Sequence, residues 1–221
     1  MALLVSFGAV PAPAGATSYS NRIDVAAAHA GEVAGESDTD ARVGTTGWRS
    51  GTFMIGDSIT RIGLVHGLRA QGLGTGWEVS AVSGRDVSTL PYYVRDRLRS
   101  QSRLRRLVIA LGTNATAGWT YQDLLAVVRL VPSPTKVILV TTYRDPGVWG
   151  ASNSYRTQAA VQAVYSRWEK RLARTTAHTC VADWRSYAKN HRSALHDGVH
   201  PTTAAARQWA KIVARAVRTC G

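Results

Sequence analysis

The sequence predicts an α/β protein, a three-layer α/β/α sandwich built around a five-stranded parallel sheet. Five short apolar runs alternate along the chain with stretches whose apolar residues recur at helical spacing. This alternation is typical of parallel sheets that are covered by helices on both faces. The run 107–111, Leu-Val-Ile-Ala-Leu, is apolar throughout, as expected of a strand buried on both sides.

The predicted strands cover residues 52–55, 77–82, 107–111, 136–141 and 179–183. The predicted helices cover residues 59–68, 90–98 and 121–131, a stretch from Asn153 to Leu172, and a last helix that includes 205–216. Thr120 and Asp123 match a capping box, and Asn153 can cap the helix that it begins. Pro91 is expected to break the start of its helix, and Pro132 to end the helix before it.

The domain boundaries follow from changes in composition. Residues 49–221 are expected to form the folded domain, and residues 17–48, rich in small and polar residues, a flexible linker. Residues 1–16 are similar to the later part of a secretory signal with Ala14-Gly15-Ala16 as cleavage site, although a basic n-region is missing. A disordered Ala/Pro-rich leader is the alternative. A secreted or cell-wall-associated protein is expected.

The chain of 221 residues is strongly basic, with a formal net charge of +13. Such a charge suits contact with anionic wall polymer or an anionic surface. The Arg-rich run 95–106 is either a solvated face or a polyanion site. We expect no specific nucleic-acid partner and no integral membrane protein, because no apolar run reaches the length of a span. No metal or other cofactor is expected, since the sequence has no close Cys pair and its His residues are scattered.

Polar residues with catalytic potential follow the predicted strands. They are Ser58, Gly84 and Asn114 after the first three strands, and Asp197 with His200 before the last helix. Ligand sites of parallel sheets lie beyond the carboxyl ends of the strands, so these residues should converge on one edge. They include a nucleophile, a base, a carboxylate and oxyanion donors, the set that acyl transfer needs. A helix cap at Asp57 or Ser58 is the simpler reading of that turn.

Four sequence blocks carry a family resemblance: Gly56-Asp57-Ser58, Gly84, Gly112-Thr113-Asn114 and Asp197-Gly198-Val199-His200. In this order they are similar to the blocks of the SGNH/GDSL hydrolases, over about residues 52–217. The resemblance implies a flavodoxin-like SGNH hydrolase fold. It also implies that Ser58 is the nucleophile, His200 the general base and Asp197 its partner, with the Ser58 and Gly84 N–H groups and the Asn114 amide as oxyanion hole.

A narrower resemblance concerns the substrate. The segments 107–114, 141–153, 182–184 and 197–201 look like the SGNH domains fused to membrane acyltransferases that O-acetylate peptidoglycan and related polymers. It implies a serine esterase for short O-acyl esters, with acetyl groups on a small ester or an acylated carbohydrate as the substrate. Arg85, Tyr143 and Trp149 are candidate substrate contacts. An O-acetyltransferase using the same residues and a non-catalytic binder of anionic polymer are the alternatives.

The chain has two cysteines, Cys180 and Cys220. This count is compatible with one disulfide in an exported protein or with two separate buried thiols. In the fold that the resemblance implies, the last helix runs antiparallel to the fifth strand and brings its end near the beginning of that strand. A disulfide between Cys180 and Cys220 is therefore predicted.

Overall fold

The computed structural model describes residues 51–68, 77–100, 104–115, 118–148 and 150–220. The predicted leader 1–16 and linker 17–48 lie outside these residues. A five-stranded parallel sheet has the strand order β2-β1-β3-β4-β5. Its strands are β1 (Thr52–Gly56), β2 (Trp77–Ala81), β3 (Arg106–Ala110), β4 (Lys136–Val140) and β5 (Thr179–Ala182). The predicted fold class is thus confirmed.

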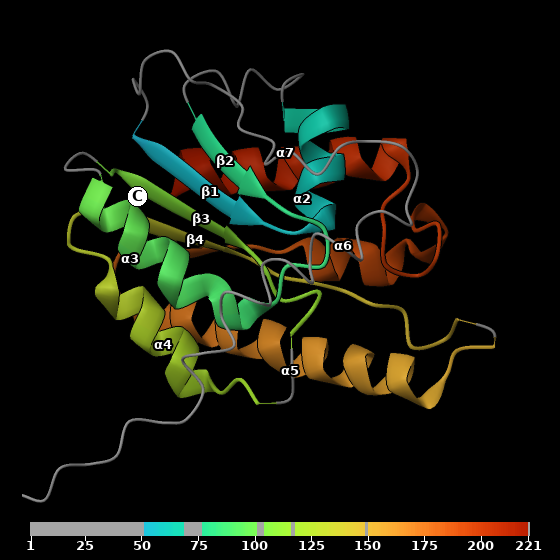
Figure 1. The fold of residues 1–221 in the computed structure, drawn as a ribbon. Helices are drawn as coiled ribbons and strands as arrows, with labels where there is room; N and C mark the ends of the chain where they lie inside the picture. The colour runs from blue at the N-terminus through green and yellow to red at the C-terminus, as the bar shows by residue number, and fades with distance from the viewer. Residues whose placement is uncertain (1–50, 69–76, 101–103, 116–117, 149, 221) are drawn as a thin grey trace, which may run out of the picture. The chain divides into compact units, whose positions relative to one another are not determined.

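Helices cover both faces of the sheet (Figure 1). One face is covered by α3 (Leu90–Ser100), α4 (Tyr121–Leu130) and α5 (Asn153–Thr175), and the other by α2 (Ser58–Gly63), α6 (Trp184–Asn190) and α7 (Thr203–Thr219). Three short helical segments complete the order: η3 (Leu64–Leu68), η5 (Val87–Thr89) and η6 (Arg192–Ala194).

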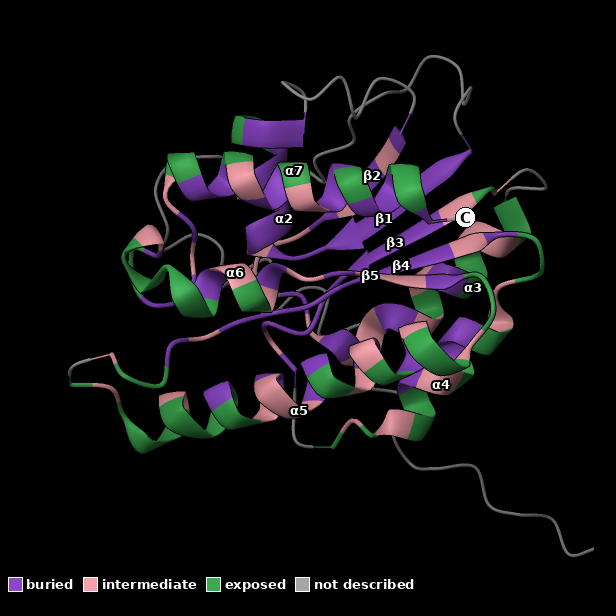
Figure 2. Cartoon of the chain, turned by 180° about the vertical axis from the view of Figure 1, so that it is seen from behind, coloured by how far each residue is buried: buried purple, intermediate pink, exposed green. Residues whose placement is uncertain are grey.

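The strands alternate their side chains between two apolar cores. In β1, Phe53 and Ile55 pack with α3, α4 and α5, whereas Met54 packs with the helices of the other face. All three side chains are buried, and the three inner strands β1, β3 and β4 are purple along most of their length in Figure 2. Burial on both faces explains why the strands read as continuous apolar runs in the sequence.

The predicted helix ends differ from the structure at two positions, Asn153 and Pro91. The Thr120–Asp123 capping box is present at the start of α4. The predicted Asn153 cap is wrong, because Ser152 has the extended backbone of a cap and its Oγ accepts from the Tyr155 N–H, while Asn153 is already helical. Pro91 does not break α3, since it lies in the first turn, where no intrahelical N–H bond is needed.

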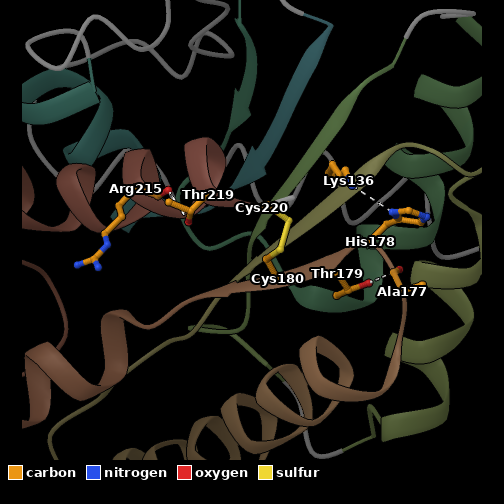
Figure 3. The surroundings of a disulfide bond; sticks show 8 residues. All are labelled: Lys136, Ala177, His178, Thr179, Cys180, Arg215, Thr219 and Cys220. Carbon is orange, nitrogen blue, oxygen red and sulfur yellow. Dashed lines mark hydrogen bonds between the residues drawn. A yellow bond between two sulfur atoms is a disulfide. The ribbon is translucent and has the colours of Figure 1, made fainter.

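A disulfide joins Cys180 in β5 to Cys220 at the end of α7, as predicted (Figure 3). It ties the beginning of the last strand to the end of the last helix. The two cysteines are separated by 40 positions.

The Arg-rich run is not uniformly solvated. Arg95 and Arg99 are exposed, but Arg97 forms an ion pair with Glu78 and lies over the Phe53 ring. Arg103 lies outside the described residues.

Within the described part of the chain, no helix combines the length and the apolar character needed to cross a membrane.

Candidate active site

Ser58 lies at the turn between β1 and α2. The Asp57 side chain caps α2 by accepting a hydrogen bond from the Ile59 N–H at 3.0 Å. Gly56 is needed at this turn because a Cβ there would lie 1.9 Å from Thr60 Oγ1. The cap reading of the turn is therefore correct for Asp57, and it leaves the Ser58 hydroxyl free to interact at the carboxyl edge of the sheet.

Ser58, His200 and Asp197 form one hydrogen-bonded chain. Ser58 Oγ lies 3.0 Å from His200 Nε2, and His200 Nδ1 lies 2.7 Å from Asp197 Oδ2. A carboxylate at Nδ1 favours the tautomer in which Nδ1 carries the proton and Nε2 can accept one from the serine. The arrangement has the geometry required for a general base acting on a hydroxyl nucleophile.

The loop before α7 holds the carboxylate in place. Asp197 Oδ1 accepts hydrogen bonds from the N–H groups of Val199 at 2.9 Å and His200 at 2.8 Å. Partial burial raises the pKa of Asp197, but these bonds and the His200 ring outweigh it, so the pKa is lowered from its ordinary value. Asp197 is therefore ionised at neutral pH and can stabilise a protonated His200.

The two other polar blocks also lie at this edge. The turn 82–85 is attached to the end of β1, since the Val82 N–H donates to the Gly56 carbonyl. Gly84 in this turn has a positive φ of 72° and open space where a Cβ would be. The Asn114 amide donates to the Arg85 carbonyl at 3.4 Å, which joins the third block to the second. Gly84 and Asn114 are thereby brought together beside the β1–α2 turn.

The three candidate substrate contacts have different surroundings. Arg85 is buried and donates to the carbonyls of Ser80 and Gly56, and its guanidinium lies over the Tyr93 ring. Tyr143 is also buried, with its hydroxyl donating to Asp145. These contacts favour a structural role for both side chains. Trp149 lies outside the described residues.

Two residues that the sequence analysis did not single out support the Asp197–His200 loop. The Tyr155 hydroxyl donates to the Asp197 carbonyl at 3.3 Å, and the Asp145 N–H donates to the Gly198 carbonyl at 2.8 Å. Asp145 lies in the long connection between β4 and α5, and Tyr155 lies in the first turn of α5. Tyr155 and Asp197 are 42 positions apart, and no local pattern in the sequence indicates such a contact.

Asp57 is the buried acid nearest to the nucleophile in sequence. Burial raises its pKa from 3.8 to about 6, against the opposing effects of the nearby Thr113 side chain, of the hydrogen bond from the Ile59 N–H and of the charge of His200. A second buried acid, Glu169 in α5, has a pKa raised well above 4.5, chiefly by burial.

The described residues contain no group of three or more His, Cys, Asp or Glu side chains placed to hold a metal ion.

Several solved structures have a fold similar to that of this chain. No protein-family model matches the chain, and no curated protein matches it significantly. Among solved structures, the C-terminal catalytic domain of the Streptococcus pneumoniae peptidoglycan O-acetyltransferase A, bearing a methylsulfonyl adduct, aligns with a TM-score of 0.64 at 24% identity, covering 76% of this chain and 93% of that one.

Two further structures show the same likeness. A member of the lipolytic G-D-S-L family from Veillonella parvula has a TM-score of 0.62 at 17% identity, covering 76% of this chain and 98% of its own. A variant of the Geobacillus stearothermophilus acetyl xylan esterase has a TM-score of 0.53 at 21% identity, with coverage of 77% and 94%. The chain therefore has the fold seen in the SGNH/GDSL hydrolases.

Proposed function

We propose that this chain, which has the SGNH/GDSL hydrolase fold, is a serine esterase of that family that hydrolyses short O-acyl esters through an acyl-enzyme. The observation that carries the proposal is the hydrogen-bonded chain from Ser58 through His200 to Asp197. Each member is of the residue type that its role requires, and the distances are those of hydrogen bonds.

In the proposed reaction, Ser58 Oγ attacks the ester carbonyl while His200 Nε2 takes the hydroxyl proton. Asp197 keeps the imidazole oriented and stabilises its charge. The tetrahedral oxyanion accepts hydrogen bonds from the N–H groups of Ser58 and Gly84 and from the Asn114 amide. His200 then gives its proton to the leaving alcohol, which leaves an acyl group on Ser58. Water, deprotonated by His200, releases the carboxylic acid and restores the serine.

The proposed substrate is an acetyl or similarly short ester on a carbohydrate. Supporting observations are the likenesses in fold to an acetyl xylan esterase and to a peptidoglycan O-acetyltransferase domain. Trp149 remains a candidate substrate contact, whereas the burial of Arg85 and Tyr143 favours other roles for them. The proposed location is outside the cytoplasm, in keeping with the Cys180–Cys220 disulfide.

Transfer to a sugar hydroxyl is the second candidate activity, because one of the similar structures is the catalytic domain of an O-acetyltransferase. The first half of the reaction would be the same. The two activities differ in whether the acyl-enzyme passes its group to water or to an acceptor alcohol. Product analysis with an acetyl donor, with and without carbohydrate acceptors, separates them.

The first experiment is hydrolysis of a short-chain chromogenic ester by the purified protein, compared with Ser58→Ala. Ser154→Ala, at an exposed serine in the first turn of α5, is the matched control. We expect Ser58→Ala to abolish turnover above background and Ser154→Ala to retain it. Equal rates in Ser58→Ala and the wild type would refute the proposal. A chain-length series from acetyl to octanoyl then defines the acyl group.

A further inference from the structure

A small cavity of about 10 Å³ lies next to Asp57. It is bounded by the β1–α2 turn, by residues at and after the ends of β3 and β4, and by one tryptophan each from α6 and α7. Every residue that lines it is buried. Its size is about that needed to hold one water molecule.

Four of the lining residues contribute buried polar atoms that have no hydrogen-bond partner among the described residues. The atoms are Asp57 Oδ2, Thr113 Oγ1, Thr142 Oγ1 and Trp184 Nε1. Thr141 lines the same cavity but differs, because its hydroxyl accepts from the Arg185 N–H at 2.8 Å and lies 3.1 Å from Asp183 Oδ1. Buried polar groups are nearly always satisfied by protein or by ordered water, so unpaired atoms on four residues around one cavity favour a shared partner.

The chemistry of the four atoms selects the partner. Asp57 Oδ2 accepts hydrogen bonds, the Trp184 indole N–H can only donate, and the two threonine hydroxyls can do either. A metal cation would be opposed by the indole N–H, and an anion by the Asp57 carboxylate. An apolar occupant would leave all four groups unpaired. Water donates two hydrogen bonds and accepts two, which matches this set.

Other buried polar atoms do not share this arrangement. Gln162 Oε1, the Tyr165 hydroxyl and both carboxyl oxygens of Glu169 also have no partner among the residues that the structure describes. None of these three residues lines the cavity. What distinguishes the Asp57 site is that four residues with complementary unpaired atoms line a single water-sized space.

We propose that this cavity binds one structural water molecule, which donates to Asp57 Oδ2, accepts from Trp184 Nε1 and bonds to the hydroxyls of Thr142 and Thr113. The water joins the turn that presents Ser58 to the segment after β4 and to α6. It also gives the second oxygen of Asp57 a partner, while the first oxygen caps α2. The proposal is independent of the proposed esterase activity, because it concerns the support of the turn and not the reaction.

A high-resolution crystal structure of the full chain tests the site directly. We expect one solvent peak within hydrogen-bond distance of Asp57 Oδ2 and of at least two of the other three atoms. In solution, the Trp184 indole proton should show a nuclear Overhauser effect to a long-lived water. Loss of that indole resonance in Trp184→Phe assigns the signal.

Two variants with small changes in volume complete the test. Thr142→Val removes one hydroxyl, so the solvent peak should lose occupancy, whereas Thr142→Ser keeps the hydroxyl and should keep the peak. An empty cavity in the wild-type crystal structure would overturn the proposal, as would density for a metal ion or a repacked side chain in its place. Full occupancy in Thr142→Val would also overturn the part assigned to Thr142.

Discussion

Ser58 Oγ and His200 Nε2 lie 3.0 Å apart although 142 positions separate the two residues. The serine follows β1, the second strand in the sheet order β2-β1-β3-β4-β5, and the histidine precedes α7, the last helix. In a parallel sheet, the segments that follow the strands meet at one edge. Because the Ser58–His200 hydrogen bond lies at that edge, changes to the residues around it should change the proposed esterase activity.

Replacement of Asp197 by Asn should lower kcat about a thousandfold or more, because an amide that donates to Nδ1 leaves the proton on Nε2 and prevents it from accepting the Ser58 proton. The Asn side-chain oxygen can still accept from the Val199 and His200 N–H groups, so the fold should persist. Steady-state hydrolysis measures the loss, and an unchanged melting temperature shows that folding is not its cause. Undiminished kcat in a folded Asp197→Asn protein would contradict the assigned role.

Asn114→Ala removes the side-chain donor of the proposed oxyanion hole. We expect kcat to fall on the order of a hundredfold or more, with a small change in KM, since the amide acts mainly on the charge that develops in the transition state. The comparison variant is Asn153→Ala, at an exposed asparagine in the first turn of α5, which should retain full activity. A loss confined to KM would instead assign Asn114 to substrate binding.

Gly198→Ala should disturb the Asp197–His200 loop. Gly198 has a φ of +81°, and a Cβ there would lie 2.3 Å from Val148 Cγ2 and 2.4 Å from the Tyr155 hydroxyl. Gly150→Ala is the matched control, because Gly150 has a φ of +73° but open space around a Cβ. Both variants carry backbone strain of roughly 1–2 kcal/mol, so thermal unfolding should show a cost in each. Only Gly198→Ala should also lose most of its activity, and equal activities would argue against a role for the close packing.

The buried carboxyl of Asp57 should make the free energy of unfolding depend on pH. Its pKa is about 6 in the folded protein and 3.8 as the ordinary value, so the folded state binds more protons between these two pH values. The stability that this group contributes is present below pH 3.8 and is lost as the pH rises through about 6. From pH 4 to pH 7 the wild type should therefore lose up to about 3 kcal/mol relative to Asp57→Asn.

Denaturant unfolding across this pH range measures the difference. Asn can still cap α2, so the comparison isolates the charge. Asp96→Asn, at an exposed carboxyl in α3, should run parallel to the wild type. A constant gap between Asp57→Asn and the wild type at all pH values would contradict the expectation.

Loss of the Cys180–Cys220 bond should destabilise the folded state by about 4 kcal/mol in the chain-entropy model, given the 40 positions between the two cysteines. Thermal unfolding of the wild type with and without reductant gives the change in melting temperature. The double variant Cys180→Ser/Cys220→Ser should unfold at the lower temperature under both conditions. A wild-type melting temperature that does not respond to full reduction would refute this expectation.

Much of the fold could be predicted because its signals are local. The strands of a doubly covered sheet are apolar runs, and the Thr120–Asp123 box begins a helix through bonds between residues three positions apart. The prediction was wrong where adjacent residues offer equivalent chemistry: Ser152 and Asn153 can both cap a helix, and the backbone conformation selects Ser152. The convergence of Ser58, Gly84, Asn114 and His200 on one sheet edge could be predicted, since a parallel topology alone implies it.

The sequence by itself determined the strand and helix pattern and the sheet edge at which Ser58, Asn114 and His200 meet; the pairing of the two cysteines followed from the fold that the family resemblance implies. Only the tertiary structure decided which groups support that edge: the Tyr155 hydroxyl on the Asp197 carbonyl, the burial of Arg85, and the cavity beside Asp57. The physical reason is that secondary structure and sheet order follow from periodicity within short windows. Side-chain contacts between distant segments depend instead on close packing, which no local window contains.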